Sequence, residues 1–211
     1  MKVAILLGGE LRGNDETWQC IKKLSEHLNA KIYVSSDEKW KDMPFEFSWI
    51  KTSEPQKNIF SKESWYLHND KERYYHQWRH LNSCYNFVKN DLTNDDIIIK
   101  IRNDLVFDIF DVYNILNFVV CPEKEFHSGR NFDKNSVCND QILFMNKQVA
   151  DIYFNLMYGK NFDPEKNINH VKGNIKLKNI GIESVIREHL RNNNIDIKTF
   201  KLNYYKVRNK L

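Results

Sequence analysis

The chain has 211 residues, of which 41% are hydrophobic and 13% aromatic, and its formal net charge is +4. This composition excludes a disordered chain, and no apolar run approaches the roughly 20 residues of a membrane-spanning helix. We therefore expect one α/β domain over residues 1–211, located in the cytoplasm. The cysteines lack the close spacing of zinc ligands, which favours free thiols in a reducing compartment; they are Cys20, Cys84, Cys121 and Cys138.

The first 35 residues have the pattern of a strand, a helix and a second strand. Lys2–Leu7 is an apolar run closed by two glycines, as expected for a buried parallel strand. Residues 15–28 repeat apolar side chains at helical spacing, with Asn14 or Asp15 as the cap. Lys31–Ser35 has the apolar density of the next strand. Together these segments predict a βαβ opening and a parallel sheet.

The same periodicities predict the elements that follow. In chain order they are a strand near Phe45–Ile50, a helix over 71–90, a strand at Ile97–Ile101, an apolar segment at 105–119 that fits strand or helix, a strand at Val119–Cys121, a helix over 140–158, a helix at Ile182–Leu190 and one or two strand-like runs beyond it. The expected fold class is α/β, with a mostly parallel sheet flanked by helices.

In the stretch DDIIIKIRNDLVFDIF, residues 95–110, two apolar segments are separated by the polar residues Arg102, Asn103 and Asp104. Unpaired charges are costly to bury. Ligands of open α/β sheets bind beyond the carboxyl ends of the strands, so these side chains are expected at the rim of a ligand site. An arginine there can pair with phosphate oxygens, and a carboxylate can hold a divalent cation. The alternative is an ion pair between Arg102 and Asp104 that has no ligand.

The stretch LLGGELRG places Gly8, Gly9, Glu10 and Arg12 directly after the first strand. Glycines allow a close approach of the backbone to a ligand, and the following helix N-terminus favours anions. The spacing matches neither a dinucleotide-binding fingerprint nor a P-loop. Because turns also use glycine pairs, the arginine is what favours a phosphate contact.

The stretch SVCNDQILFMNK, residues 136–147, puts Asn139 and Asp140 at the mouth of the predicted helix over 140–158. Either residue can be an N-cap. The functional alternative is a carboxylate that binds an acceptor hydroxyl or removes its proton.

The helix over 71–90 contains HQWRH, with His76 and His80 one helical turn apart. This spacing can hold a metal ion, but the segment lacks the glutamate of a zinc-protease motif, which disfavours a metal role. Gln77 and Arg79 on the same helix are expected to be solvated rather than to reach a ligand.

These segments, in this order, resemble nucleotide-sugar-dependent glycosyltransferases of the GT-A type. They are most similar to small viral and bacterial enzymes that build capsid glycans, capsules or lipopolysaccharide, and the resemblance covers roughly residues 1–195. It is carried by LGGELR at Leu7–Arg12, YYHQWRHLNSCYNFVK at 74–89, IRNDLVF at Ile101–Phe107, NDQILFM at Asn139–Met145 and GIESVIREHL at Gly181–Leu190.

The resemblance implies transfer of a sugar from a nucleoside-diphosphate donor to a glycan, glycolipid or other hydroxyl acceptor, in a bacterial or virus-infected cytoplasm. The donor site it implies consists of Gly8, Gly9, Glu10, Arg12, Arg102 and Asp104. The implied cofactor is Mg²⁺ or Mn²⁺, with Asp104 as its ligand. The family pattern is Asp-x-Asp, and here Arg102 occupies the first position. Arg102 itself is therefore an alternative group to neutralise the leaving charge.

An inverting enzyme also needs a carboxylate base, for which Asp140 is the preferred candidate and Glu183 the second. Two rival functions remain open at this point. One is a nucleotide-binding domain that lacks catalysis, because the first acid is missing. The other is a nucleic-acid-binding module, although we expect no nucleic-acid partner.

The rival nucleic-acid function rests on the basic end of the chain, which from about residue 198 carries a charge of +5 and leaves −1 on the remainder. Such a tail can contact an anionic membrane surface, nucleic acid or an anionic substrate, or it can be a solvated chain end. Its basic residues are Lys198, Lys201, Lys206, Arg208 and Lys210.

Overall fold

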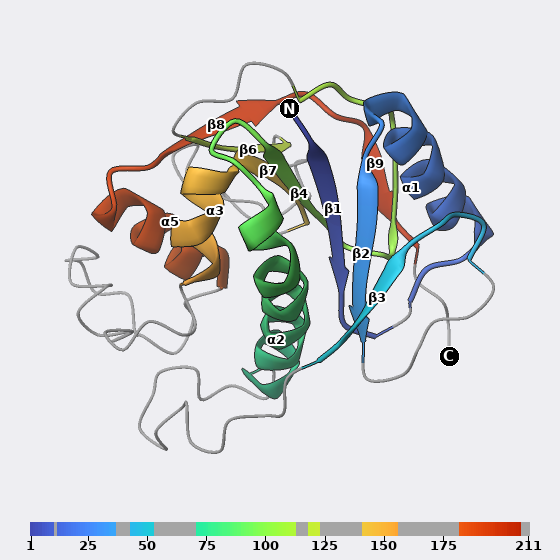
Figure 1. Cartoon of the computed structure of the whole chain (residues 1–211), viewed down its shortest axis with the longest axis horizontal. Helices are drawn as coiled ribbons and strands as arrows, with labels where there is room; N and C mark the ends of the chain where they lie inside the picture. Colours follow the sequence, from blue (N-terminus) through green and yellow to red (C-terminus); the bar gives the residue numbers. More distant parts are fainter. Residues whose placement is uncertain are drawn as a thin grey trace, which may run out of the picture.

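The structure is a computed structural model, and it describes residues 1–10, 12–36, 43–52, 71–112, 118–122, 141–155 and 182–207. The main sheet has seven strands in the order β3-β2-β1-β4-β7-β6-β8 (Figure 1). Their bounds are β1 Val3–Gly8, β2 Lys31–Ser36, β3 Ser48–Lys51, β4 Ile97–Ile101, β6 Phe118–Pro122, β7 Ile142–Asn146 and β8 Asp196–Phe200.

A second sheet pairs β5, Leu105–Phe107, with β9, Tyr204–Lys206. The helices are α1 Asp15–Leu28, α2 Lys71–Val88, α3 Lys147–Phe154 and α5 Ile182–Asn192, with a short 3₁₀ turn η1 at Lys89–Asp91. Within these described ranges, no helix combines the length and the hydropathy needed to cross a membrane.

The half of the main sheet from β3 to β4 is parallel throughout. Strand β7 runs antiparallel to both β4 and β6, and β6 is again parallel to β8. The predicted α/β class, with a mostly parallel sheet and flanking helices, is therefore confirmed (Figure 1).

The central strands are buried because both faces of the sheet are covered. Leu6 and Ile98 contribute to the core beneath α2 and α3, whereas Ile5 and Ile99 contribute to the core beneath α1. Adjacent residues of one strand point to opposite faces, so continuous apolar runs are what such strands require. This double coverage is why β1 and β4 are found where the apolar runs predict them.

Helix α1 begins where its capping signal predicts. The side chain of Asn14 accepts a hydrogen bond from the backbone N–H of Thr17 at 3.1 Å, and the Thr17 hydroxyl oxygen accepts from the backbone N–H of Asn14 at 2.9 Å. This reciprocal pair satisfies two backbone donors that the helix leaves unbonded. The helix ends at Leu28, and the C-cap residue Asn29 adopts a left-handed conformation with φ of 49°.

The prediction of a helix over 140–158 is wrong in its first part. Residues 142–146 form strand β7, every one of them is buried, and the helix α3 begins only at Lys147. The four consecutive apolar residues Ile142–Met145 have no polar face, so periodicity alone cannot separate a buried strand from a buried helix. The N-cap of the helix is Asn146, whose side chain accepts from the N–H of Val149, while Asn139 and Asp140 lie outside the described residues.

Candidate anion-binding site at the carboxyl ends of strands β1 and β4

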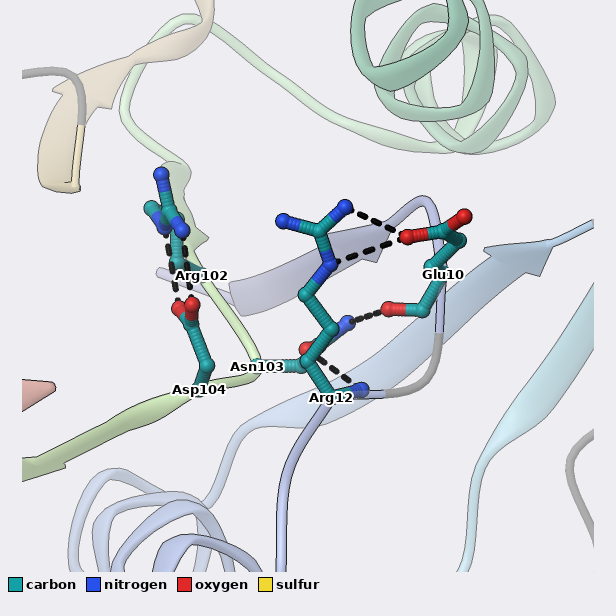
Figure 2. Close-up of polar contacts among 5 residues, drawn as sticks. All are labelled: Glu10, Arg12, Arg102, Asn103 and Asp104. Atoms are coloured by element: carbon teal, nitrogen blue, oxygen red, sulfur yellow. Dashed lines mark hydrogen bonds and ion pairs between the residues drawn. The ribbon is translucent and has the colours of Figure 1, made fainter. Parts of the chain in front are cut away.

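Strands β1 and β4 are parallel neighbours, with Leu6 opposite Lys100. Their carboxyl ends therefore lie at the same edge of the sheet. The loop that follows β1 and the turn that follows β4 come together there (Figure 2). Two of the three polar segments of the sequence thus meet in space as expected.

Asn103 joins the two segments through its side-chain amide. Its Nδ2 donates to the carbonyl of Glu10 at 2.8 Å, and its Oδ1 accepts from the backbone N–H of Arg12 at 3.2 Å. The residue is only 5% exposed, so these bonds are made away from water, where an unsatisfied backbone group is expensive. The amide fixes the path of the β1 loop and with it the position of Arg12 (Figure 2).

Gly13 is required by this same junction. A Cβ atom at this position would lie 2.4 Å from the carbonyl oxygen of Asn103 and 2.4 Å from Oγ1 of Thr17. Real Cβ atoms do not come that close to other atoms. Only glycine allows the start of the α1 cap and the turn after β4 to touch.

The sequence predicts that Gly8 and Gly9 let a ligand approach the backbone, and the structure gives each glycine a role within the fold as well. A Cβ atom on Gly8 would lie 2.8 Å from the backbone nitrogen of Leu81, so Gly8 lets α2 pack against the strand. Gly9 has a φ of 102°, and its N–H donates to the carbonyl of Ser35 at 3.0 Å. Glycine adopts that positive φ without strain.

Arg102 and Asp104 form a bidentate ion pair. The Nε of Arg102 donates to one carboxylate oxygen at 2.9 Å, and Nη2 donates to the other at 2.6 Å. The two side chains are 20% and 9% exposed. Burial raises the pKa of Asp104, but the hydrogen bonds and charge of Arg102, with the charge of Lys206, outweigh burial and hold the pKa below its usual range. The carboxylate is therefore ionised at neutral pH and engaged by its neighbour.

Arg12 and Glu10 form a second pair of a different kind. Arg12 donates to the Oε2 atom of Glu10 from Nε at 3.0 Å and also from Nη2. The side chain of Arg12 is 32% exposed and that of Glu10 is 73% exposed. Exposed pairs contribute little stability, so an anionic ligand can take the place of Glu10 at small cost. Figure 2 shows the guanidinium groups of Arg12 and Arg102 extending to the same side of Asn103.

Lys206 brings a third positive charge to this edge from the far end of the chain. Strand β9 pairs with β5 so that Lys206 is opposite Leu105, and the N–H of Val207 donates to the carbonyl of Asp104 at 2.9 Å. The side chain of Lys206 is exposed. Residues 204–206 of the basic tail are thus part of a sheet beside the site.

The third predicted segment approaches the same place from β7. The backbone N–H of Arg102 donates to the carbonyl of Gln141 at 2.9 Å, and Ile101 is opposite Ile142. Gln141 directly follows Asp140, which lies outside the described residues. Glu183 lies in the first turn of α5, and its side chain is likewise outside them. Neither candidate base is located by the structure.

Helix α2 contributes buried polar side chains near Gly8. Arg79 is buried, so the expectation that it is solvated is wrong. His80 is also buried, and its Nδ1 lies 2.5 Å from the hydroxyl oxygen of Thr52 and 3.3 Å from that of Ser35. These contacts give His80 a packing role at the ends of β2 and β3. The side chains of His76 and Gln77 are outside the described residues.

The described residues do not fit a divalent metal centre. Mg²⁺ and Mn²⁺ prefer several hard oxygen ligands. Asp104 was the expected ligand, but both of its carboxylate oxygens accept from Arg102. No group of three or more His, Cys, Asp or Glu side chains among the described residues is arranged to hold a metal ion.

Asn103, Gly13 and Lys206 are the residues of this site that sequence reasoning missed. Asn103 stood in the quoted motif, but an asparagine between two charges is also a common turn former. The sequence offers no local signal for the other two, because their roles depend on contacts with distant segments.

No protein-family profile matches the sequence, and a search of curated proteins returns no match. Among solved structures, the chain is similar to the glycosyltransferase GlyE of Streptococcus pneumoniae TIGR4, with 13% identity, a TM-score of 0.44, and coverage of 95% of this chain and 46% of GlyE. The chain therefore spans less than half the length of that protein.

Two further solved structures are similar at comparable levels. A putative glucose-1-phosphate thymidylyltransferase from Bacillus anthracis, in complex with a sucrose, has 9% identity, a TM-score of 0.46, and coverage of 98% of this chain and 89% of that one. The galactosyltransferase LgtC, in complex with donor and acceptor sugar analogues, has 8% identity, a TM-score of 0.40, and coverage of 93% and 72%.

Proposed function

We propose that the chain is a glycosyltransferase that moves a sugar from a nucleoside-diphosphate-sugar donor to a hydroxyl of a glycan or glycolipid acceptor. The observation that carries the proposal is the position of Arg12 and Arg102 on two segments that Asn103 joins at the carboxyl edge of a mostly parallel sheet (Figure 2). That edge is where open α/β sheets bind ligands, and paired arginines recognise phosphate oxygens. The ordered motifs that resemble GT-A enzymes agree with this placement.

In the proposed reaction, the bond between the sugar carbon C1 and the phosphate oxygen breaks, and a bond from the acceptor oxygen to C1 forms. The electron pair of the broken bond leaves with the nucleoside diphosphate, whose growing negative charge the arginines stabilise. The acceptor proton passes to a carboxylate, for which Asp140 is the first candidate and Glu183 the second. The contact of Gln141 with Arg102 supports a place for the segment around Asp140 beside the donor.

Thermal-shift measurements with UDP-, GDP-, CMP- and dTDP-linked sugars test the proposal first. At least one donor should raise the melting temperature, because a ligand that binds only the folded state stabilises it. The same donor should then release free nucleotide in the presence of glycan or glycolipid acceptors. If no donor stabilises the protein while oligonucleotides do, the chain is instead a nucleic-acid-binding module.

One observation favours a second candidate, a nucleotide-binding domain without catalysis. The position of the first acid of the family pattern is held by Arg102, which is paired with Asp104. A donor that stabilises the protein but undergoes neither transfer nor hydrolysis would support this candidate. Contact of the basic tail with an anionic membrane stays a prediction, which co-sedimentation with phosphatidylserine vesicles tests.

A further inference from the structure

We infer that the donor diphosphate is bound without a divalent cation, by Arg102 together with Arg12 and Lys206, and that Asp104 is the positioning residue that holds Arg102. This inference rests on the proposed function, because it concerns the donor of that reaction. It goes further by naming what balances the charge of the leaving group.

The first step is the state of the lone acid in the turn after β4. A hard cation would need the oxygens of Asp104, yet these accept two charge-assisted hydrogen bonds from Arg102 at 2.9 and 2.6 Å. Such two-pronged pairs are among the strongest hydrogen-bonded contacts in proteins. A cation would have to break both bonds and then lie beside the displaced guanidinium, where like charges repel. The carboxylate is better placed to orient an arginine than to ligate a metal.

The second step is the fixed position of Arg102. Its side chain is held by Asp104, and its backbone N–H is held by the carbonyl of Gln141 at 2.9 Å. The pair uses Nε and Nη2, and so it fixes the orientation of the rigid, planar guanidinium. An arginine that is oriented before the ligand arrives loses less conformational freedom on binding, which favours affinity.

The third step is the charge of the whole edge. Three cationic side chains belong to this edge: Arg12 pairs with Glu10, Arg102 pairs with Asp104, and the charge of Lys206 lowers the pKa of Asp104. The pair between Arg12 and Glu10 is exposed and easily exchanged for a phosphate. Such a group of cationic side chains attracts a diphosphate by its own charge, so no added cation is needed.

The deciding experiment is isothermal titration of the full chain with UDP, GDP, CDP and dTDP, in EDTA and in MnCl₂. The protein is first stripped with EDTA and dialysed. We expect the nucleotide that binds to have a Kd in EDTA within threefold of that in MnCl₂. Binding that needs Mn²⁺, or is at least tenfold tighter with it, overturns this inference and leaves the proposed function standing. If none of these nucleotides binds in either condition, the proposed function is overturned as well.

Variants locate the effect on the named residues. Arg102→Asp rebuilds an acid-x-acid pair and should raise the Kd in EDTA at least tenfold, while Asp104→Glu should retain metal-free binding. Lys206→Met should weaken binding about threefold, with Lys201→Met, another exposed lysine of the same tail, as the matched control. Unchanged binding in EDTA for Arg102→Asp overturns the inference; should that variant fail to fold, the titration of the unmodified chain still decides.

Asp104→Asn separates positioning from a merely structural role. The variant keeps the shape of the side chain and removes the charge that orients Arg102. We expect the affinity for the nucleoside diphosphate to fall about tenfold and the affinity for the free nucleoside to change by less than twofold. Equal losses for both ligands would show a general structural role and overturn the assignment of Asp104.

Discussion

The two ends of strand β4 each carry a buried aspartate, and the two acids have different partners. At the amino end, Asp96 is 3% exposed and accepts from backbone N–H groups of Lys2 at 2.5 Å and Thr93 at 2.7 Å. At the carboxyl end, Asp104 accepts from the side chain of Arg102. Backbone donors are fixed by the fold, so Asp96 fastens the start of β1 to the start of β4. The donor to Asp104 is instead a charged side chain, that of Arg102, and such a group can also contact a ligand.

The comparison shows how an acid can be assigned a role from its partners rather than from its burial. Both carboxyl groups have a pKa below the usual range. Burial raises the pKa of Asp96, and hydrogen bonds from Thr93 and Lys2 lower it by more. The positive charge near Asp96 that lowers its pKa further is that of the chain's amino terminus, whereas the charges near Asp104 are those of the side chains of Arg102 and Lys206. We therefore assign Asp96 a structural role and Asp104 a role in the candidate site.

The largest effect is expected for Gly13→Ala, which disturbs the junction at the carboxyl end of β4. The new Cβ would overlap the carbonyl oxygen of Asn103, so the β1 loop has to move away from the turn after β4. We expect a loss of about 3 kcal/mol in the free energy of unfolding, measured in urea, and at least a tenfold loss in nucleotide affinity. Unchanged values for both would show that the loop and the turn are not tightly joined.

A smaller effect is expected for Asn103→Leu, which removes the amide but keeps a buried side chain of similar size. The carbonyl of Glu10 and the N–H of Arg12 then lose their partners, which costs about 2 kcal/mol. Nucleotide affinity should fall at least fivefold, because the path of the loop sets the position of Arg12. Urea unfolding measures the loss of stability, and titration calorimetry measures the loss of affinity. An unchanged affinity would show that Asn103 does not contribute to nucleotide binding.

The amino end is tested by Asp96→Asn, for which we expect a loss of about 1.5 kcal/mol at pH 7 and an unchanged nucleotide affinity. Because the pKa of Asp96 is lowered in the folded state, its contribution is complete above the unfolded pKa of about 3.9 and disappears as the pH falls through the folded value. The difference in unfolding free energy between the variant and the natural chain should therefore decrease as the pH falls below the unfolded pKa. A difference that is constant with pH would contradict a role for the charge.

The smallest effect is expected for Glu10→Gln. Its pair with Arg12 is exposed, so the free energy of unfolding should change by less than about 0.5 kcal/mol. Removing the competing carboxylate should make diphosphate binding up to threefold tighter, as titration calorimetry would detect. Weaker binding would mean that Glu10 itself contacts the donor.

Sequence patterns were sufficient where structure is decided locally. The run Ile97–Ile101 predicts β4 with its observed bounds, because four isoleucines and one lysine between Asp96 and Arg102 have the length and apolar density of a short buried strand. Asn14 predicts the start of α1 through its capping side chain. The meeting of the loop after β1 with the turn after β4 also follows, since parallel neighbours end at one edge. The strand at 142–146 is not predicted by the sequence, because its four consecutive apolar residues, Ile142–Met145, show no periodicity that separates a strand from a helix.

The rest of the site depends on contacts between distant parts of the chain. Nothing near Asn103 indicates that its amide bonds to residues 10 and 12, and nothing near Gly13 indicates that it touches Asn103. In the sequence Lys206 is one lysine of a basic tail, and its place beside the site depends on the pairing of β9 with β5, which sets it opposite Leu105. Residue type and local spacing carry no information on such pairings, so they could not be predicted from one sequence.

Strand β9 has a consequence for the order in which the site is made during synthesis. It follows every other described element in the chain, and its partner β5 lies far upstream. A nascent chain still short of residue 204 on the ribosome carries Arg12 and Arg102 but not Lys206. The edge therefore reaches its full positive charge only when the final strand emerges, so premature termination would yield a sheet that is largely assembled but electrostatically incomplete.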